Sequence, residues 1–371
     1  MSRLPPIRYF ARTKGISGYA SASRAFALAL SASKIKTKFE LSCESMDFMG
    51  SYLDFAGKPK IDLYLNMPPF SQHKSKNYKI GYFYWETDTL PAPWVSSIRF
   101  LDEIWAPCEL VASACRNSGF SGPIEVLPTP ALPQPAEVSI SIPSPISEEY
   151  LISDGVFKFY SIFQWHERKG FRELLKAYYG EFGEKDNVIL IIKTSKLDSK
   201  SYNKEQIYLD IINLKRKLNQ KFYPRVYLID RSIPFQNIMA LHKYCDCYVS
   251  ASHGEGWGMP MHDALGAENL LITPKFGGIT EYLDEDSAHI VSHQMGPVKN
   301  MGWQPLYDRS QRWAYPSVSS LRKNMREAYS DPESGLKKIE AAKKIAETMS
   351  VEGVGRRMEE ILALPRFKKY A

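Results

Sequence analysis

Cysteine is scarce in this sequence, and long apolar runs are missing. The 371 residues include five cysteines, an odd number, and no CxxC pair accompanies histidines at zinc spacing. We therefore expect reduced, mostly buried thiols and no metal site. No stretch approaches the ~20 apolar residues of a membrane span, and residues 1–17 lack the apolar core of a signal peptide. These absences predict a cytoplasmic protein. The cysteines are Cys43, Cys108, Cys115, Cys245 and Cys247.

Acidic residues are fewer than basic ones. Lys and Arg total 48 against 41 Asp and Glu, which gives a net charge of +7. Such a charge fits an anionic substrate, an anionic membrane surface or nucleic acid. The basic clusters at residues 74–79, 215–217 and 366–369 are each interpreted as a solvated face. No DNA- or RNA-binding motif occurs, so we expect no nucleic-acid partner. A peripheral position on the inner membrane face stays open, as does the oligomeric state.

The fold class follows from length and pattern. At 371 residues the chain exceeds the roughly 250 to 300 residues at which one hydrophobic core stops growing. Short β-branched and aromatic runs alternate with helical stretches, which is typical of an α/β protein with parallel sheets. The predicted strands span residues 61–65, 79–84, 103–106, 124–127, 156–163, 188–192, 226–230, 247–250 and 270–273.

A proline- and serine-rich stretch at residues 128–149 divides the strands into two groups. Proline cannot donate a hydrogen bond within a sheet, so this composition indicates a linker, which we place at 136–150. The chain then has an N-terminal domain at 1–135, a C-terminal domain at 151–345 and a final segment at 346–371. Apolar residues near helical spacing predict helix from 333 to 364.

The most informative segment is SASHGEGWGMPMHDALGAENLLITPKFGGITEYL, residues 250–283. A predicted strand ends in a glycine-rich turn, and a helix begins near Pro260, because proline suits a first helical turn. The backbone amides of the turn would then lie at a helix N-terminus, where they can bind phosphate oxygens. The residues that carry these amides are Gly256, Trp257, Gly258 and Met259.

Two acids frame this turn. Glu255 precedes it and Asp263 lies in the helix, with seven residues between them. Helical rise over that interval gives roughly 12 Å, which is too long for the carboxylate pair of a glycosidase at ~5 to 9.5 Å. The spacing instead favours gripping two ends of one extended ligand.

This segment resembles the donor-binding signature of family 4 retaining glycosyltransferases. In that family an acid, seven residues and a second acid bracket the nucleotide sugar. The resemblance implies that Glu255 faces the hydroxyls of the transferred sugar and that Asp263 holds the ribose. The family usually has Glu at the second position, so Asp263 is a shortened variant.

A second segment, FYSIFQWHERKGFRELLKAYYGEF at residues 159–182, resembles the strand, basic loop and helix that line the diphosphate in this family. The resemblance implies that Arg168 and Lys169 stabilise the negative charge of the departing nucleoside diphosphate. Many members carry Arg where this chain has Gln164, so that phosphate contact is either absent or supplied by Arg168.

A third segment, residues 79–120, is similar to a tryptophan-glutamate segment in the N-terminal domain of one branch of the family. It implies that Glu86 lies in the cleft, where it orients the acceptor hydroxyl or accepts its proton, and that Trp85 stacks on a sugar ring. The alternative is that Trp85 belongs to the core and that Glu86 is a structural hydrogen-bonding group.

Three further features match the family less specifically. Gly15 and Gly18 precede a helical stretch and resemble its glycine loop, where donor phosphate and acceptor meet. Glu281 follows a Gly-Gly turn and either contacts the nucleotide or caps the next helix. The family's N-terminal histidine has no clear equivalent here, although Asn66 and His73 lie in the corresponding region.

The resemblance as a whole implies a GT-B fold: two Rossmann-like domains, a deep cleft between them and a C-terminal helix that returns to the N-terminal domain. It implies a hexosyltransferase that retains configuration, needs no metal or other cofactor, and transfers a hexose from a GDP- or UDP-linked donor. The acceptor would be a glycan or a lipid-linked molecule, as in polysaccharide biosynthesis. Two alternatives stay open: a nucleotide-sugar-binding pseudoenzyme with this fold, and a nucleotide-sugar epimerase.

Overall fold

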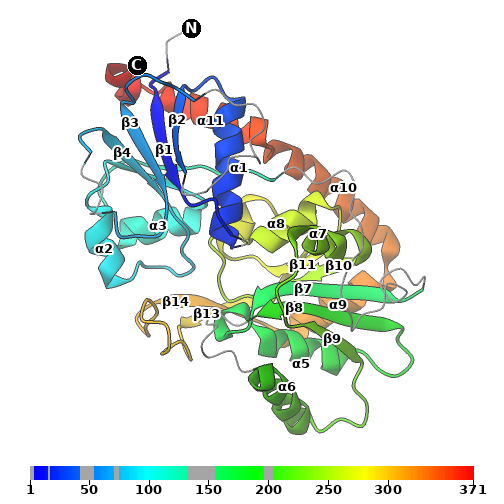
Figure 1. The fold of residues 1–371 in the computed structure, drawn as a ribbon. Helices are drawn as coiled ribbons and strands as arrows, with labels where there is room; N and C mark the ends of the chain where they lie inside the picture. Colours follow the sequence, from blue (N-terminus) through cyan, green and yellow to red (C-terminus); the bar gives the residue numbers. More distant parts are fainter. Residues whose placement is uncertain (1–3, 16, 42–53, 71–74, 133–154, 196–203) are drawn as a thin grey trace.

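The computed structural model describes residues 4–15, 17–41, 54–70, 75–132, 155–195 and 204–371. Cys43, His73 and the predicted linker at 136–150 lie outside these residues. The described chain forms two lobes, each built on a six-stranded parallel sheet with helices packed against it (Figure 1).

The N-terminal sheet has the strand order β2-β1-β3-β4-β5-β6, and every neighbouring pair is parallel. Its strands are β1 (Ile7–Ala11), β2 (Thr37–Leu41), β3 (Ile61–Leu65), β4 (Tyr78–Tyr82), β5 (Glu103–Ala106) and β6 (Ile124–Val126). Its helices are α1 (Gly18–Ala32), α2 (Ala92–Ile98) and α3 (Glu109–Asn117).

The C-terminal sheet has the order β12-β11-β10-β7-β8-β9 and is also parallel throughout. Its strands are β7 (Phe157–Gln164), β8 (Val188–Ser195), β9 (Arg225–Ile229), β10 (Cys247–Val249), β11 (Leu270–Pro274) and β12 (His289–Val291). Its helices are α5 (Phe171–Glu181), α6 (Lys204–Leu218), α7 (Phe235–Tyr244), α8 (Met259–Gly266), α9 (Val318–Ser330) and α10 (Pro332–Thr348). An antiparallel hairpin of β13 (His293–Pro297) and β14 (Arg312–Pro316) extends from this lobe.

Burial on both faces explains why these strands are continuous apolar runs. Side chains alternate across a strand, so Phe159 and Tyr160 of β7 point to opposite sides of the sheet. Both are fully buried, and each belongs to a different apolar cluster. A parallel sheet covered by helices on both faces needs such sequences.

The strand order of the C-terminal sheet places a crevice at its centre. The chain runs outward from β7 to β9 on one side and from β10 to β12 on the other. Loops that follow β7 and β10 therefore diverge to opposite faces of the sheet. Ligands of open α/β sheets bind at the carboxyl ends of strands at such a reversal.

The C-terminal end of the chain returns to the N-terminal lobe, as predicted. Helix α10 packs on α8 and β11, whereas α11 (Val351–Leu362) packs on α1 and contributes to the core of the first lobe (Figure 1). The predicted helix at 333–364 is thus two helices. Ser350 separates them, because its side chain accepts a hydrogen bond from the amide of Gly353 and begins α11.

Each predicted strand has a counterpart in the structure. The sequence pattern does not predict β1, β2 or β12 to β14, which, except for β1, lie at a sheet edge or in the hairpin. The domain boundaries at 135, 151 and 346 remain predictions.

Candidate active site

Two loops meet where the C-terminal sheet reverses its order. The loop after β7 forms a short 3-10 turn, η2 (Glu167–Lys169), and then enters α5. The loop after β10 carries Glu255. The carbonyl of Arg168 accepts hydrogen bonds from the amide of His253 at 2.7 Å and from the hydroxyl of Ser252 at 3.1 Å. These bonds fix the two loops against each other.

Glycine is required where the two loops touch. Gly170 has φ +61°, in the left-handed region that favours glycine. A β-carbon at this position would also overlap the carbonyl of Ala251. The sequence therefore permits close contact between the loops only because residue 170 has no side chain.

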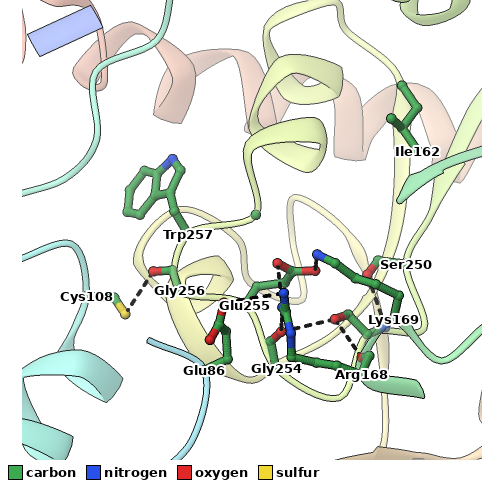
Figure 2. A network of polar contacts seen from close by, with 12 residues as sticks. Glu86, Cys108, Ile162, Arg168, Lys169, Ser250, Gly254, Glu255, Gly256 and Trp257 are labelled. Carbon is green, nitrogen blue, oxygen red and sulfur yellow. Dashed lines mark hydrogen bonds and ion pairs between the residues drawn. The ribbon is translucent and has the colours of Figure 1, made fainter. Parts of the chain in front are cut away.

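Ion pairs join the predicted site residues. The ammonium of Lys169 lies 2.6 Å from Glu255 Oε1, and Arg168 Nη1 lies 3.4 Å from Oε2 (Figure 2). The side chains of Lys169 and Glu255 are each 14% exposed. Both line one pocket, together with Ser250, Gly258 and Pro260. The structure thus brings the cations and the first acid together, although the sequence separates them by some 86 positions.

The charges at this cluster shift each other's protonation. Burial alone would raise the pKa of Glu255, but Lys169 and Arg168 outweigh burial and hold the pKa below its usual value. Burial lowers the pKa of Lys169, and the charge of Glu255 only partly opposes this effect. For Arg168 burial is outweighed by Glu86 and Glu255, so its pKa is raised. Arg168 is therefore a permanent cation of the site.

Glu86 reaches this cluster from the other lobe. It follows β4, and its Oε1 lies 3.4 Å from Arg168 Nη2. The hydroxyl of Tyr307, in the loop between β13 and β14, donates a 2.8 Å hydrogen bond to Oε2. The ring of Tyr307 also stacks on Trp85, with centroids 5.0 Å apart. Trp85 is buried and packs on Trp94 as well, so it is a core residue, as in the alternative interpretation.

The glycine-rich turn packs against the N-terminal lobe. A β-carbon at Gly254 would overlap the carbonyl of Glu86, and one at Gly256 would lie 2.7 Å from Cβ of Tyr84. The thiol of Cys108 donates to the carbonyl of Gly256 at 3.3 Å (Figure 2). The missing side chains at Gly254 and Gly256 therefore allow the backbone of the N-terminal lobe to pack closely on the turn.

The turn before α8 is mostly buried: Gly256, Trp257 and Gly258 are buried, and of these three only Gly258 lines the pocket. Helix α8 begins after Gly258, which has φ +87° and gives no side-chain cap. Among the described residues, no acceptor pairs with the amides of Gly256, Trp257, Gly258 or Met259. The hydroxyl of Tyr282 holds the turn from behind by donating to the carbonyl of Trp257 at 2.9 Å. Free amides at a helix start attract negative charge.

Asp263 lies in the second turn of α8 and is half-buried. Burial raises its pKa to about 7. No described side chain forms an ion pair or hydrogen bond with its carboxyl group. The estimate of roughly 12 Å between Glu255 and Asp263 assumed helical rise over the whole interval. That assumption was wrong, because α8 begins only at Met259.

The remaining predicted residues lie around the lobe interface. Glu281 Oε1 accepts a 2.8 Å hydrogen bond from the amide of Glu109, the first residue of α3. It therefore caps a helix, but in the other lobe and not the next one along the chain. Gly15 is exposed at φ +102°, whereas Gly18 begins α1. A β-carbon at Gly18 would lie 3.7 Å from Met259, so the two glycine motifs border each other.

The sequence did not predict that Tyr307 and Cys108 contact the site. Tyr307 and Cys108 carry no local motif, and each contacts a residue that is distant in the sequence. Asn66 directly follows β3, and its side chain forms no hydrogen bond with another described residue. In the part of the chain that the structure describes, no helix is both long and apolar enough to cross a bilayer.

Comparison with known proteins establishes the architecture. No family model matches the chain, and no curated protein matches its sequence. Solved structures do match. Anabaena HepE, in complex with UDP and glucose, has 11% identity and a TM-score of 0.64, covering 97% of this chain and 99% of HepE. A trehalose-6-phosphate protein from E. coli, bound with UDP-2-fluoro glucose, has 11% identity and a TM-score of 0.65, with coverage of 96% and 98%.

A third match is the pneumococcal O-GlcNAc transferase GtfA in complex with UDP and GlcNAc, with 11% identity and a TM-score of 0.54. It covers 81% of this chain and 56% of GtfA. At such identity the likeness shows the fold. The chain has the GT-B fold, with two Rossmann-like domains, as predicted.

Proposed function

We propose that this protein is a glycosyltransferase of the family 4 type that moves a hexose from a UDP-linked donor to a hydroxyl group of a glycan or lipid-linked acceptor. The observation that carries the proposal is the pocket shared by Lys169 and Glu255 at the reversal of the C-terminal sheet. Three solved structures with the same fold contain UDP and glucose, UDP-2-fluoro glucose, or UDP and GlcNAc. These ligands favour UDP over GDP.

Lys169 and Arg168 would stabilise the leaving group. When the bond between sugar and diphosphate breaks, negative charge grows on the diphosphate oxygens, and fixed cations lower the energy of that transition state. In this structure the carboxylates of Glu255 and Glu86 neutralise both cations. The diphosphate would take over part of this pairing, and the free amides of the turn 256–259 would supply further donors.

Glu255 and Asp263 would bind the two sugars of the donor. Glu255 is held as a carboxylate beside the cations and can accept hydrogen bonds from hydroxyls of the transferred hexose. Asp263 lies further along α8, and its half-buried carboxyl group can receive hydroxyls of the ribose. The donor would extend along the start of α8, with the diphosphate between the two acids.

Glu86 would serve the acceptor. It approaches the cations from the N-terminal lobe, so it lies on the side from which an acceptor bound to that lobe would attack. Attack on the face that the diphosphate leaves retains the anomeric configuration. Among the described residues no cluster of three His, Cys, Asp or Glu could hold a metal ion. Arg168 and Lys169 would neutralise the charge of the leaving diphosphate.

The test is a donor-consumption screen with UDP-, GDP- and dTDP-hexoses in the presence of a mixed panel of glycan and lipid-linked acceptors. We expect turnover with a UDP-hexose, unchanged by a metal chelator, and a loss of about 100-fold or more in Lys169→Ala and Glu255→Ala. Glu184→Ala and Lys185→Ala are matched controls, because both residues are exposed and distant from the pocket lining. Proton NMR of the product would report retention at the anomeric carbon.

Two other outcomes identify the alternatives. Conversion of the donor sugar without any acceptor would indicate an epimerase. Binding of UDP without donor consumption under any condition would indicate a nucleotide-sugar-binding pseudoenzyme. Equal activity of the two site variants and their controls would contradict the assignment of the pocket.

A further inference from the structure

Helix α6 exposes an apolar stripe to solvent. Of the ten large apolar side chains that the described chain leaves exposed, four lie between residues 208 and 222. Three of them are on α6: Tyr208, Leu209 and Ile212, with exposed fractions of 47%, 45% and 43%. Positions three and four residues apart share one face of a helix, so the three form a continuous surface. Phe222, 40% exposed, follows the helix.

The opposite face of α6 already serves the core. Ile207 and Leu214 are buried and pack in the same apolar cluster as α5. The exposed stripe is therefore an additional apolar face. Figure 1 shows α6 at the end of the C-terminal lobe that lies farthest from the N-terminal lobe. Apolar side chains gathered on a surface in this way are typical of an interaction site.

Basic residues outnumber acidic ones beside the stripe, although Glu205 lies one helical turn before Leu209 and the hydroxyl of Tyr208 is hydrogen-bonded to Asp230. Residues 211–229 contain five basic residues and no Asp or Glu. Arg216 lies one helical turn after Ile212, on the same face. Arg216, Lys217 and Lys221 are exposed, and no described carboxylate forms an ion pair with any of them. The exposure of Arg216 and Lys217 agrees with the solvated face predicted from the sequence.

The composition of this surface selects its partner. A helix with exposed apolar residues on one face and basic residues at its margin suits the interface of a bilayer, where the apolar side chains enter and the cations contact anionic headgroups. A second copy of the chain would bring like charges together. Tyr208 and Phe222 offer aromatic rings on which a base could stack, but stacked bases would leave the aliphatic side chains of Leu209 and Ile212 in water.

We propose that residues 208–222 form a docking surface for membranes that contain anionic lipids. Tyr208, Leu209, Ile212 and Phe222 insert at the headgroup boundary, while Arg216, Lys217 and Lys221 bind the anionic headgroups. The attraction is partly electrostatic, so it weakens as the salt concentration rises. This surface acts independently of the candidate active site.

Vesicle flotation tests the proposal with the full-length protein. Vesicles of phosphatidylcholine alone are compared with vesicles that also contain phosphatidylglycerol. We expect binding to the anionic vesicles only. A double variant, Leu209→Ser with Ile212→Ser, and a charge variant, Arg216→Glu with Lys217→Glu, should each lower the partition coefficient by about tenfold or more, since each basic residue near an anionic surface contributes about 1 kcal/mol.

Matched controls come from α10, where Leu336 and Lys344 are also exposed. Leu336→Ser and Lys344→Glu should bind as the unmodified protein does, and all variants should keep its thermal unfolding midpoint. Binding to neutral vesicles at equal strength, no binding to either kind, or equal losses in the controls would overturn the proposal. So would a light-scattering result in which the Leu209→Ser and Ile212→Ser variant turns a dimer into a monomer.

Discussion

Replacing Gly254 by alanine should separate the two lobes. The turn at Gly254 packs so closely on the N-terminal lobe that a β-carbon would overlap the carbonyl of Glu86. Carbon contacts need about 3.5 to 4.0 Å. Since the obstacle is backbone and not a flexible side chain, relief requires a movement of more than about 1 Å between the lobes.

The structure gives the size of the effect. The bond from the Glu109 amide to Glu281 measures 2.8 Å, and the bond from the Arg312 amide to Asp88 measures 2.7 Å. An opening of about 1 Å takes both beyond hydrogen-bonding range. Losing two bonds worth about 1 kcal/mol each, or straining an overpacked contact by about 1 to 3 kcal/mol, predicts a loss of roughly 1 to 3 kcal/mol in the free energy of unfolding.

The assay combines unfolding in urea, followed by tryptophan fluorescence, with donor consumption. Glu86 moves with its lobe, so we expect donor turnover to fall by about 100-fold, because a displacement of this size disrupts alignment. Gly302→Ala is the control, since no atom lies within 4 Å of a β-carbon at Gly302. If Gly254→Ala keeps both the stability and the turnover of the control, the lobe contact described here does not matter in solution.

Three further predictions concern individual side chains. Lys169→Met and Glu255→Gln should each lower the free energy of unfolding by about 3 to 5 kcal/mol, because each leaves a buried charge with a weaker partner. In urea unfolding, the loss in the double variant should be smaller than the sum of the two single losses by at least about 1 kcal/mol. Strict additivity would contradict the pairing. Tyr307→Phe should lower the free energy of unfolding by about 1.5 to 3 kcal/mol, the value of a hydrogen bond to a carboxylate. Tyr307→Leu should lower it further, because the stacking on Trp85 also disappears. Equal losses in the two variants would argue against the stack. The pKa of Asp263 is about 7 in the folded protein and 3.8 in the unfolded chain, so the folded state favours the protonated form. As pH rises from about 4 to 7, the unmodified protein should therefore lose stability relative to Asp263→Asn. A difference in unfolding temperature that stays constant over this range would refute the shift.

The sequence predicts most of the architecture because burial determines its pattern. The first five residues of β8, at 188–192, are all apolar, since both faces of a parallel sheet are covered. β1 is harder to identify because Arg8 interrupts its apolar residues, and its partner β2 lies at the edge of the sheet. The hydrogen bond between Ser350 and Gly353 divides the last helical stretch into α10 and α11. The spacing of apolar residues does not indicate this local break.

The site was predictable only where its residues belong to local motifs. Arg168, Lys169 and Glu255 follow strand ends, so topology alone brings them together. Tyr307 lies in a hairpin loop and contacts Glu86 across 221 positions of sequence. The bond between Glu281 and Glu109 likewise depends on how the lobes dock. Contacts of this kind follow from the packing of whole domains, so no spacing of residues indicates them.

Calorimetric titration with UDP tests the central claim most directly, because it reports whether the cationic pocket binds a nucleoside diphosphate. We predict that UDP binds to the unmodified protein and that Lys169→Met weakens binding by about 10- to 100-fold, the equivalent of one charged hydrogen bond of about 1.5 to 3 kcal/mol. The control Lys185→Met should bind UDP normally. Equal affinity of Lys169→Met and the control, with both proteins folded, would contradict the account.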